Sequence, residues 1–350
     1  MAKNTTQEQL SDAGFFEGAE KVLKIWFSAN DDENKKDDGH KCDLRLIPRF
    51  ELDYVLQIIK ASIVSYISNE YIDSYVLSES SMFISQNRII LKTCGITELL
   101  YAMKPLLDLA KKYANMIDVK NIFYSRREFL QPDMQQGIHK SFDDEANFLK
   151  NIFPDGTSHV FGKEESDRWY LFSMNHSKSG SPLTDVTLEI LMSDMCERTM
   201  THFTESSYGN SDELMLNTGI SSLFPGSMHD GVIFDPVGYS VNGLLDKFYY
   251  TIHVTPQPDC SYVSFETNIQ NENYYELIAK LAAIFKPGKF IVTLFSNREV
   301  ICGTAKKALS PIVLRNYLCN HENFKQLNTY SIEYRLYTKD ELLKELNTEV

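Results

Sequence analysis

The sequence predicts an α+β fold in which β-sheets pack face to face beneath outer layers of helices. Short segments of alternating hydrophobicity, typical of half-buried strands, interleave with amphipathic helical segments along the chain. In the second half of the chain the order strand, helix, strand is clear. A sheet that carries helices on its outer face buries its other face against a second sheet. The chain has 350 residues, 43% of them hydrophobic, which is enough to bury a large core.

Apolar residues at helical spacing predict three helices in the first half. The three stripes are Val22, Leu23, Ile25 and Trp26; then Leu99, Leu100, Met103, Leu106, Leu107 and Ala110; then Phe148, Leu149 and Ile152. Pro105 either bends the second helix or marks a new start. Residues 30–41 are charged and carry no apolar anchor, so we expect a mobile surface insert there.

Strands and one further helix complete the pattern. We expect successive strands at 158–162, 169–174 and 187–192, which would close the first half. In the second half, residues 262–266 alternate as a half-buried strand. The stretch 274–285 carries a helical face, and the turn at 286–289 leads into a strand at 290–295.

The peptide bond between Glu79 and Ser80 is the most informative point of the chain. The Ser80 hydroxyl can attack the Glu79 carbonyl if a donor holds the developing oxyanion, and the acyl group then passes from nitrogen to oxygen. A base that removes the Ser80 α-proton would expel the Glu79 carboxylate, and the dehydroalanine left behind hydrolyses to a ketone. The products would be a β chain, 1–79, and an α chain, 80–350, that begins with a pyruvoyl group. Glu-Ser-Ser also occurs in ordinary turns and strands.

Four other strings accompany this site: Phe15-Phe16-Glu17-Gly18-Ala19-Glu20-Lys21, Leu91-Lys92-Thr93-Cys94-Gly95, Phe234-Asp235-Pro236-Val237-Gly238-Tyr239-Ser240 and Tyr250-Thr251-Ile252-His253-Val254-Thr255-Pro256. With these strings in this order, the chain resembles S-adenosylmethionine decarboxylase of the eukaryotic, pyruvoyl-dependent type, and the resemblance runs nearly end to end. The resemblance implies a single domain, 1–350, built as a four-layer αββα sandwich of two antiparallel sheets from two related halves. It also implies decarboxylation of S-adenosylmethionine through a Schiff base with the pyruvoyl group, which yields the aminopropyl donor for spermidine and spermine.

The resemblance implies catalytic roles for Ser80, Cys94, Ser240 and His253, beside an acidic pair, Glu17 and Glu20. His253 would be the base that removes the Ser80 α-proton, and Ser240 would place its hydroxyl against the ester and ring intermediates. Cys94 would return a proton to the substrate α-carbon, since an ordinary thiol is largely protonated at neutral pH. Structural alternatives are a buried histidine bonded to the backbone, a turn serine, a packing cysteine and carboxylates in the first turn of a helix.

The resemblance also implies contacts to S-adenosylmethionine from Phe16, Leu77, Glu79, Phe234 and Gln257. Phe16 and Phe234 would sandwich the adenine, where stacking on a cationic ligand contributes on the order of 0.5–2 kcal/mol. The family commonly has a glutamate where this chain has Gln257. Glutamine can bond one ribose hydroxyl without charge assistance, so we expect weaker binding.

An acidic cluster matches the site through which animal-type members bind the activator putrescine; its residues are Lys92, Asp185, Thr187, Glu189 and Glu266. Asp185, Thr187 and Glu189 would face one side of a strand. Buried like charges need a cation. The putrescine-responsive pattern has another glutamate where this chain has Lys24, whose ammonium would supply part of the charge of putrescine; the alternative is a surface ion pair with Glu20 one helical turn away.

Composition sets outer limits on partners and surroundings. A net charge of −13 argues against nucleic-acid binding, which depends on basic residues, and suits cationic ligands. Six cysteines without a CxxC pair indicate free thiols and no metal site. The polar start and the absence of a long apolar run predict a cytoplasmic protein without a membrane span. The oligomeric state is not fixed by the sequence: animal-type members are generally dimers and plant types monomers, and we expect a homodimer.

Two other functions remain open at this point. The chain could be an inactive regulatory paralogue that activates a partner decarboxylase, although such a subunit has no need of Glu79, Ser80, Cys94, Ser240 and His253 together. It could also be a self-cleaving hydrolase whose new terminus is a free serine amine. A ketone or an amine at position 80 distinguishes these chemistries.

Overall fold

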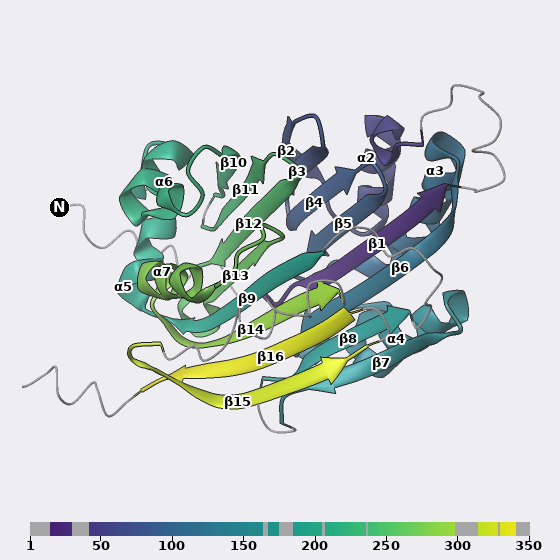
Figure 1. Cartoon of the computed structure of the whole chain (residues 1–350). Helices are drawn as coiled ribbons and strands as arrows, with labels where there is room; N and C mark the ends of the chain where they lie inside the picture. The colour runs from purple at the N-terminus through teal and green to yellow at the C-terminus, as the bar shows by residue number, and fades with distance from the viewer. Residues whose placement is uncertain are drawn as a thin grey trace, which may run out of the picture.

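The computed structural model describes residues 15–29, 42–163, 167–174, 185–204, 207–235, 237–297, 314–327 and 330–340, and the structural statements that follow concern these residues. The insert expected at 30–41 lies outside them. Figure 1 shows two broad curved sheets with helices on their outer sides. No described helix has both the length and the apolar character to cross a membrane.

The described strands form two antiparallel sheets of eight strands each. In spatial order, the first sheet contains β2 (Ile63–Ser68), β3 (Ile72–Leu77), β4 (Ser80–Ser85), β5 (Arg88–Thr93), β1 (Lys21–Ala29), β6 (Met116–Arg127), β8 (Trp169–Met174) and β7 (Gly156–Phe161). The second contains β10 (Met228–Ile233), β11 (Tyr239–Leu245), β12 (Phe248–Thr255), β13 (Tyr262–Thr267), β9 (Val186–Met195), β14 (Pro287–Asn297), β16 (Tyr330–Lys339) and β15 (Tyr317–Gln326).

Helices cover the outer face of each sheet. The first sheet carries α2 (Arg49–Ile58), α3 (Met103–Ala114) and α4 (Phe142–Ile152), and the second carries α5 (Glu197–Met200), α6 (Ser211–Thr218) and α7 (Tyr275–Phe285) (Figure 1). Short 3₁₀ turns lie at Leu44–Leu46, Leu99–Ala102, Pro132–Met134, Gly137–Lys140, Thr201–Phe203, Ile220–Ser222 and Pro258–Cys260. Each sheet shares one apolar core with its helices. A third core lies between the sheets, where Trp26 and Phe123 of the first meet Phe295 and Tyr330 of the second. The predicted four-layer α+β sandwich is confirmed.

The two sheets repeat one topology. Adding eight to each strand number of the first sheet gives the strand order of the second, from β2 and β10 at one edge to β7 and β15 at the other. The two related halves expected from the resemblance are therefore present in the chain path. The sequence shows no matching repeat, so the duplication survives in the connectivity.

One predicted element has the wrong type, and another has the right type but was placed in the wrong half of the chain. Residues from Val22 to Trp26 form strand β1 and not a helix. Leu23 and Ile25 join the core beneath the helices, whereas Trp26 joins the core between the sheets. A strand that is buried on both faces has no polar alternation, and its apolar run imitates a helical stripe. The second error concerns 187–192: these residues form β9, which lies centrally in the second sheet and does not close the first half.

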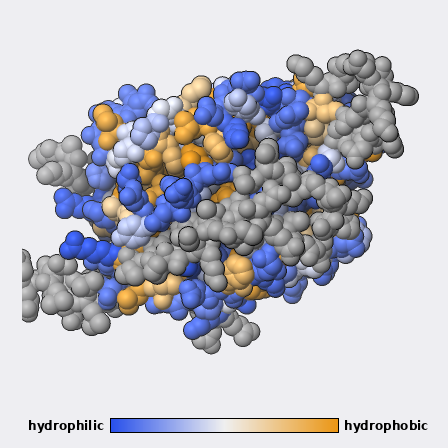
Figure 2. Space-filling view, viewed as in Figure 1, coloured by the Kyte–Doolittle hydropathy of each residue, from blue (hydrophilic) through white to orange (hydrophobic). Residues whose placement is uncertain are grey.

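The other predicted helices and strands are confirmed with small shifts in their bounds, except that β13, which was expected to be half-buried, is buried along its whole length. Pro105 is the third residue of α3, within the first helical turn, where its missing N–H costs nothing. A 3₁₀ turn at Leu99–Ala102 precedes it, so the proline marks a new start. Helices α4 and α7 carry the expected apolar faces. Most of the described surface in the space-filling view is hydrophilic, interrupted by smaller hydrophobic areas (Figure 2).

Leu188 tests how much the core beneath the second sheet contributes to stability. Its side chain is fully buried on β9, so Leu188→Ala removes apolar contacts and leaves a cavity. We expect the free energy of unfolding, measured by urea denaturation, to fall by about 2–5 kcal/mol. Leu216→Ala on α6 is the matched control, because that leucine is 71% exposed, and we expect it to leave the midpoint unchanged. Equal effects of the two substitutions would contradict the assigned core.

Candidate active site

The predicted cleavage bond lies at the tip of a hairpin. Leu77 of β3 pairs with Ser80 of β4, so Ser78 and Glu79 form a two-residue turn between the strands. Ser80 has a φ of 146°, a region that L-residues avoid at a cost of about 1–3 kcal/mol. The other described non-glycine residues with positive φ lie between 50° and 73°, in the milder left-handed helical region. Backbone strain is therefore present at the residue whose bond is expected to break.

The Glu79 carbonyl accepts two hydrogen bonds from Cys94. The backbone N–H of Cys94 lies 2.8 Å from the Glu79 oxygen, and its thiol Sγ lies 2.9 Å from it. Burial raises the pKa of the Cys94 thiol well above its ordinary value, helped by the Glu79 and Glu20 charges, so the thiol keeps its proton and donates it. Two donors on one carbonyl are the arrangement that stabilises an oxyanion.

Gly95 and Lys21 hold the Cys94 backbone in this position. Gly95 has a φ of 62°, and a Cβ there would come within 3.0 Å of the Phe16 ring. Its carbonyl accepts from Lys21 Nζ at 2.9 Å and from Gln135 Nε2 at 3.2 Å. The Lys21 side chain is fully buried, and burial lowers its pKa to about 8. The sequence interpretation missed Lys21 and Gln135; the available signal was a lysine inside an apolar strand.

The Ser80 hydroxyl donates to Glu20. Ser80 Oγ lies 2.6 Å from Glu20 Oε1, and both side chains are buried. Burial raises the pKa of Glu20, but the Lys92 ammonium and weaker neighbouring contributions outweigh this, and the pKa falls below its ordinary value. Glu20 is therefore a carboxylate that can draw the Ser80 hydroxyl proton away as Oγ attacks.

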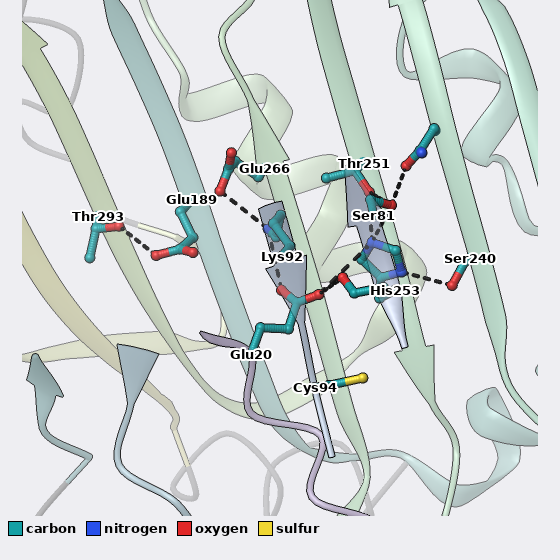
Figure 3. Close-up of polar contacts among 12 residues, drawn as sticks. Glu20, Ser81, Lys92, Cys94, Glu189, Ser240, Thr251, His253, Glu266 and Thr293 are labelled. Atoms are coloured by element: carbon teal, nitrogen blue, oxygen red, sulfur yellow. Dashed lines mark hydrogen bonds and ion pairs between the residues drawn. The ribbon is translucent and has the colours of Figure 1, made fainter. Parts of the chain in front are cut away.

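His253 is bonded at both ring nitrogens. Its Nδ1 lies 2.7 Å from Ser240 Oγ, and its Nε2 lies 3.0 Å from Ser81 Oγ and 2.8 Å from Thr251 Oγ1. Figure 3 shows the ring between Ser240 on one side and Ser81 with Thr251 on the other. Burial lowers the pKa of His253 to about 4, so the imidazole is neutral at physiological pH and can accept a proton. The bonds go to side chains, which contradicts the alternative of a histidine bonded to the backbone.

Eight of the predicted site residues line one cavity of about 310 Å³: Phe16, Glu79, Ser80, Cys94, Phe234, Ser240, His253 and Gln257. Phe16 and Phe234 are half-buried at its wall. Gln257 Oε1 accepts from the Phe16 N–H at 3.1 Å and from Cys260 Sγ at 3.1 Å, so the amide is fixed by the segment that carries Phe16. Burial raises the pKa of Glu79 to about 7.

Leu77 and Glu17 lie outside this cavity. The Leu77 side chain is fully buried in the core beneath the helices. The Glu17 carboxylate accepts from the Ala19 N–H at 3.3 Å and from the Gln131 N–H at 3.1 Å, which ties the N-terminal segment to the loop after β6. Neither Glu17 nor Glu20 lies in a helix, so the alternative of a first-turn position is wrong.

A buried chain of charges leads from Glu20 into the space between the sheets (Figure 3). Lys92 Nζ lies 3.2 Å from Glu20 Oε2 and 3.2 Å from Glu266 Oε2. Lys24 Nζ lies 3.0 Å from Glu266 Oε1. Burial works against the Glu266 charge, yet Lys24 and Lys92 lower its pKa to about 2. Lys24 is buried on a strand and pairs with Glu266, so the alternative of a surface pair with Glu20 is wrong.

The other acidic residues of the cluster also point toward the first sheet. Glu189 Oε2 accepts from Trp169 Nε1 at 3.2 Å and from Thr293 Oγ1 at 3.2 Å. Asp185 contacts Arg88 Nη1 at 3.6 Å and accepts from the Tyr330 hydroxyl at 3.0 Å. Trp169 and Arg88 both belong to the first sheet, so Glu189 and Asp185 face the same sheet, and Thr187 is also buried. Burial raises the pKa of Glu189 to about 7.

Ser81, Thr251 and Asn242 are three further polar residues that the sequence interpretation missed. They are fully buried and reach His253 directly or through one another. Their signal in the sequence is weak, because each is a small polar residue in an apolar strand, and Ser81 lies between 161 and 172 residues from Asn242, Thr251 and His253. Among the described residues no group of three or more His, Cys, Asp or Glu side chains is placed to hold a metal ion, and the described cysteines are free thiols.

Comparison with known proteins agrees with this geometry. Residues 13–338 match the family model for adenosylmethionine decarboxylase. The S-adenosylmethionine decarboxylase proenzyme of Xenopus laevis is 42% identical over 331 residues, which cover 94% of this chain and 97% of the relative. The proenzyme of Onchocerca volvulus is 44% identical over 287 residues, covering 81% and 76%. A solved Trypanosoma brucei AdoMetDC-delta26 monomer shares the fold with a TM-score of 0.57 at 22% identity, covering 74% of this chain and 98% of that one.

The charge chain predicts a large stability effect at Lys92. Lys92→Met leaves Glu20 and Glu266 without their shared ammonium in a buried site, so we expect the free energy of unfolding to fall by about 3–5 kcal/mol. Urea denaturation of the uncleavable Ser80→Ala background measures this on a single intact chain. Lys112→Met is the matched control, because Lys112 pairs with Glu51 at the surface, and we expect no measurable change. Equal midpoints for the two variants would contradict the assigned role of Lys92.

Proposed function

This chain belongs to the adenosylmethionine decarboxylase family and decarboxylates S-adenosylmethionine, and we propose that it first cuts itself between Glu79 and Ser80. The observation that carries the proposal is the backbone conformation and the hydrogen bonding around that peptide bond. Ser80 is strained at φ 146°, its hydroxyl donates to Glu20, and the Glu79 carbonyl accepts from two donors of Cys94. Nucleophile, proton acceptor and oxyanion donors are thus assembled around one peptide bond.

Processing proceeds in steps that the side chains can each assist. Ser80 Oγ attacks the Glu79 carbonyl carbon as Glu20 draws off the hydroxyl proton, and the C–N bond breaks to give an ester and a free amine. Neutral His253 then takes the Ser80 α-proton while the Glu79 carboxylate leaves, which forms dehydroalanine. Water replaces the nitrogen, ammonia is released, and residue 80 becomes a pyruvoyl group at the start of 80–350. Relief of the strain at Ser80 favours the forward direction.

The residues around Ser80 fit such a group. Ser80 lines the cavity together with the Cys94 thiol, and burial keeps that thiol protonated. When present, the pyruvoyl ketone binds the substrate amine and accepts the electron pair released with carbon dioxide. Cys94 then holds the proton that returns to the substrate α-carbon, and the cavity walls exclude bulk water from that carbon.

The cavity suits a flat, cationic nucleoside. Phe16 and Phe234 at its wall would stack on the two faces of adenine, and the Glu79 side chain would lie near the sulfonium. Gln257 would meet the ribose hydroxyls without the charge that a glutamate supplies. Leu77 would contribute through its backbone, because its side chain is in the core.

We also propose that the acidic cluster binds a diamine such as putrescine. The support is an imbalance of charge: the buried carboxylates of Glu20, Glu189 and Glu266 face the two ammonium groups of Lys24 and Lys92. Burial, together with the Glu266 and Glu20 charges, raises the pKa of Glu189 to about 7 although Lys92 and Lys24 act against it. Lys24 would supply part of the charge that the diamine brings. The homodimer and the cytoplasmic location stay predictions of the sequence.

Intact mass spectrometry tests the cleavage. We expect the wild-type chain to give fragments 1–79 and 80–350, the larger with a terminal mass that fits pyruvoyl, and the cut protein to release carbon dioxide from S-adenosylmethionine. Ser80→Ala should stay whole, because it has no nucleophile. Ser85→Ala, on the same strand, is the control that should cut like wild type. An uncut wild-type chain, or a terminal serine amine, would overturn the proposal and favour the regulatory paralogue or the hydrolase.

Decarboxylation without putrescine tests the role of Lys24. We expect the wild-type enzyme to keep part of its activity without the diamine. Lys24→Glu should lower that putrescine-free rate by about tenfold, about 1.4 kcal/mol, because it reverses a buried charge beside Glu266. Saturating putrescine should restore more of the rate in the variant than in wild type. Lys112→Glu at the surface is the control, and an absolute requirement for putrescine that Lys24→Glu leaves unchanged would refute the idea.

A further inference from the structure

A neutral histidine carries one ring proton, and the nitrogen without it is the base. In His253 both nitrogens have hydroxyl neighbours, with Ser240 at Nδ1 and both Ser81 and Thr251 at Nε2. A hydroxyl can donate or accept, so these contacts alone do not fix the proton. The position of the ring proton follows from two further residues, Asn242 and Glu20.

Asn242 determines what Ser81 can do. Asn242 Nδ2 lies 3.0 Å from the Tyr75 carbonyl oxygen, which can only accept, so the amide nitrogen points toward Tyr75. The amide oxygen Oδ1 then faces Ser81 Oγ at 2.7 Å, and Oδ1 can only accept as well. The single hydroxyl proton of Ser81 is therefore used on Asn242. What Ser81 offers to His253 Nε2 at 3.0 Å is a lone pair.

Glu20 acts on the same nitrogen through charge. Its Oε1 lies 3.8 Å from His253 Nε2, and the pair with Lys92 keeps this carboxylate ionised. A negative charge near Nε2 favours a proton there. Thr251 Oγ1 at 2.8 Å from Nε2 is compatible with either arrangement, since its hydroxyl can turn. Two independent neighbours, Ser81 and Glu20, thus favour a proton on Nε2.

We propose that Ser81, Asn242 and Glu20 hold the proton of His253 on Nε2, which leaves the basic lone pair on Nδ1 against Ser240. Ser81 and Asn242 are positioning residues for His253, and the proton that the histidine accepts arrives on the Ser240 side of the ring. This inference rests on the proposed function in one respect, the role of His253 as the base in self-cleavage. The assignment of the ring proton itself does not depend on cleavage.

Nitrogen NMR of the uncleavable Ser80→Ala protein, labelled with ¹⁵N-histidine, tests the assignment. We expect the His253 signals, identified by their loss in Ser80→Ala/His253→Gln, to show a protonated, pyrrole-type Nε2 and an unprotonated, pyridine-type Nδ1. The reverse pattern would overturn the inference. Because this protein is never cut, the result is independent of whether the proposed function holds.

Two single substitutions separate positioning from packing. Ser81→Ala removes the lone pair at Nε2, so we expect a rise in the Nδ1-protonated form and about tenfold slower cleavage of the otherwise wild-type chain. Asn242→Leu frees the Ser81 hydroxyl to donate to Nε2 and should shift the proton further. Thr251→Val is the matched control for the NMR pattern, which it should leave unchanged.

Urea midpoints of the three variants show whether each still folds. If Asn242→Leu is unfolded, Ser81→Ala decides the matter alone. A Ser81→Ala protein with the wild-type nitrogen pattern and the wild-type cleavage rate would overturn the proposal.

Discussion

The ion pair between Lys92 and its two carboxylates is the constraint on which the site depends. Carboxylates buried between two sheets are costly unless a cation accompanies them. Lys92 lies between Glu20 and Glu266 and, with Lys24 on the other side of Glu266, keeps both ionised. Glu20 in turn accepts the Ser80 hydroxyl and faces His253 Nε2. One ammonium therefore acts on both the nucleophile and the base through Glu20, although Lys92 is not among the residues that line the cavity.

The strained backbone of Ser80 and the two Cys94 donors to the Glu79 carbonyl lie at the same peptide bond because of the strand connections. The hairpin turn of Ser78 and Glu79 places Ser80 at the start of β4, directly opposite Thr93 at the end of β5. The chain then turns at Gly95, so the Cys94 N–H and thiol necessarily face the Glu79 carbonyl. Lys21 and Gln135 fix that turn from behind. The scissile bond is held between a tight hairpin and an anchored loop, and neither can relax alone.

The sequence predicted the residues that line the cavity better than the buried residues that position them. The residues that line it stand in strings with a recognisable order, so Ser80, Cys94, Ser240 and His253 could be named before any coordinates. Ser81 and Asn242 could not, because their roles depend on a contact between the two sheets across 161 residues. The error at β1 has a similar origin. Lys21 and Lys24 serve opposite faces of that strand, one behind Gly95 and one beside Glu266, and no linear period distinguishes such a strand from a helix.

The repeated topology has a consequence for the sequences of the two halves. Ser81 and Lys92 are paired on β4 and β5, and Thr251 and Glu266 are paired on the equivalent strands β12 and β13. Across the two halves, Ser81 meets Thr251 and Lys92 meets Glu266, so equivalent positions face each other. Two halves of identical sequence would place the same side chain on both sides of such a contact, so a lysine would face a lysine and a glutamate a glutamate. An ion pair at this contact therefore requires that the two halves differ in sequence there, even though they share one strand order.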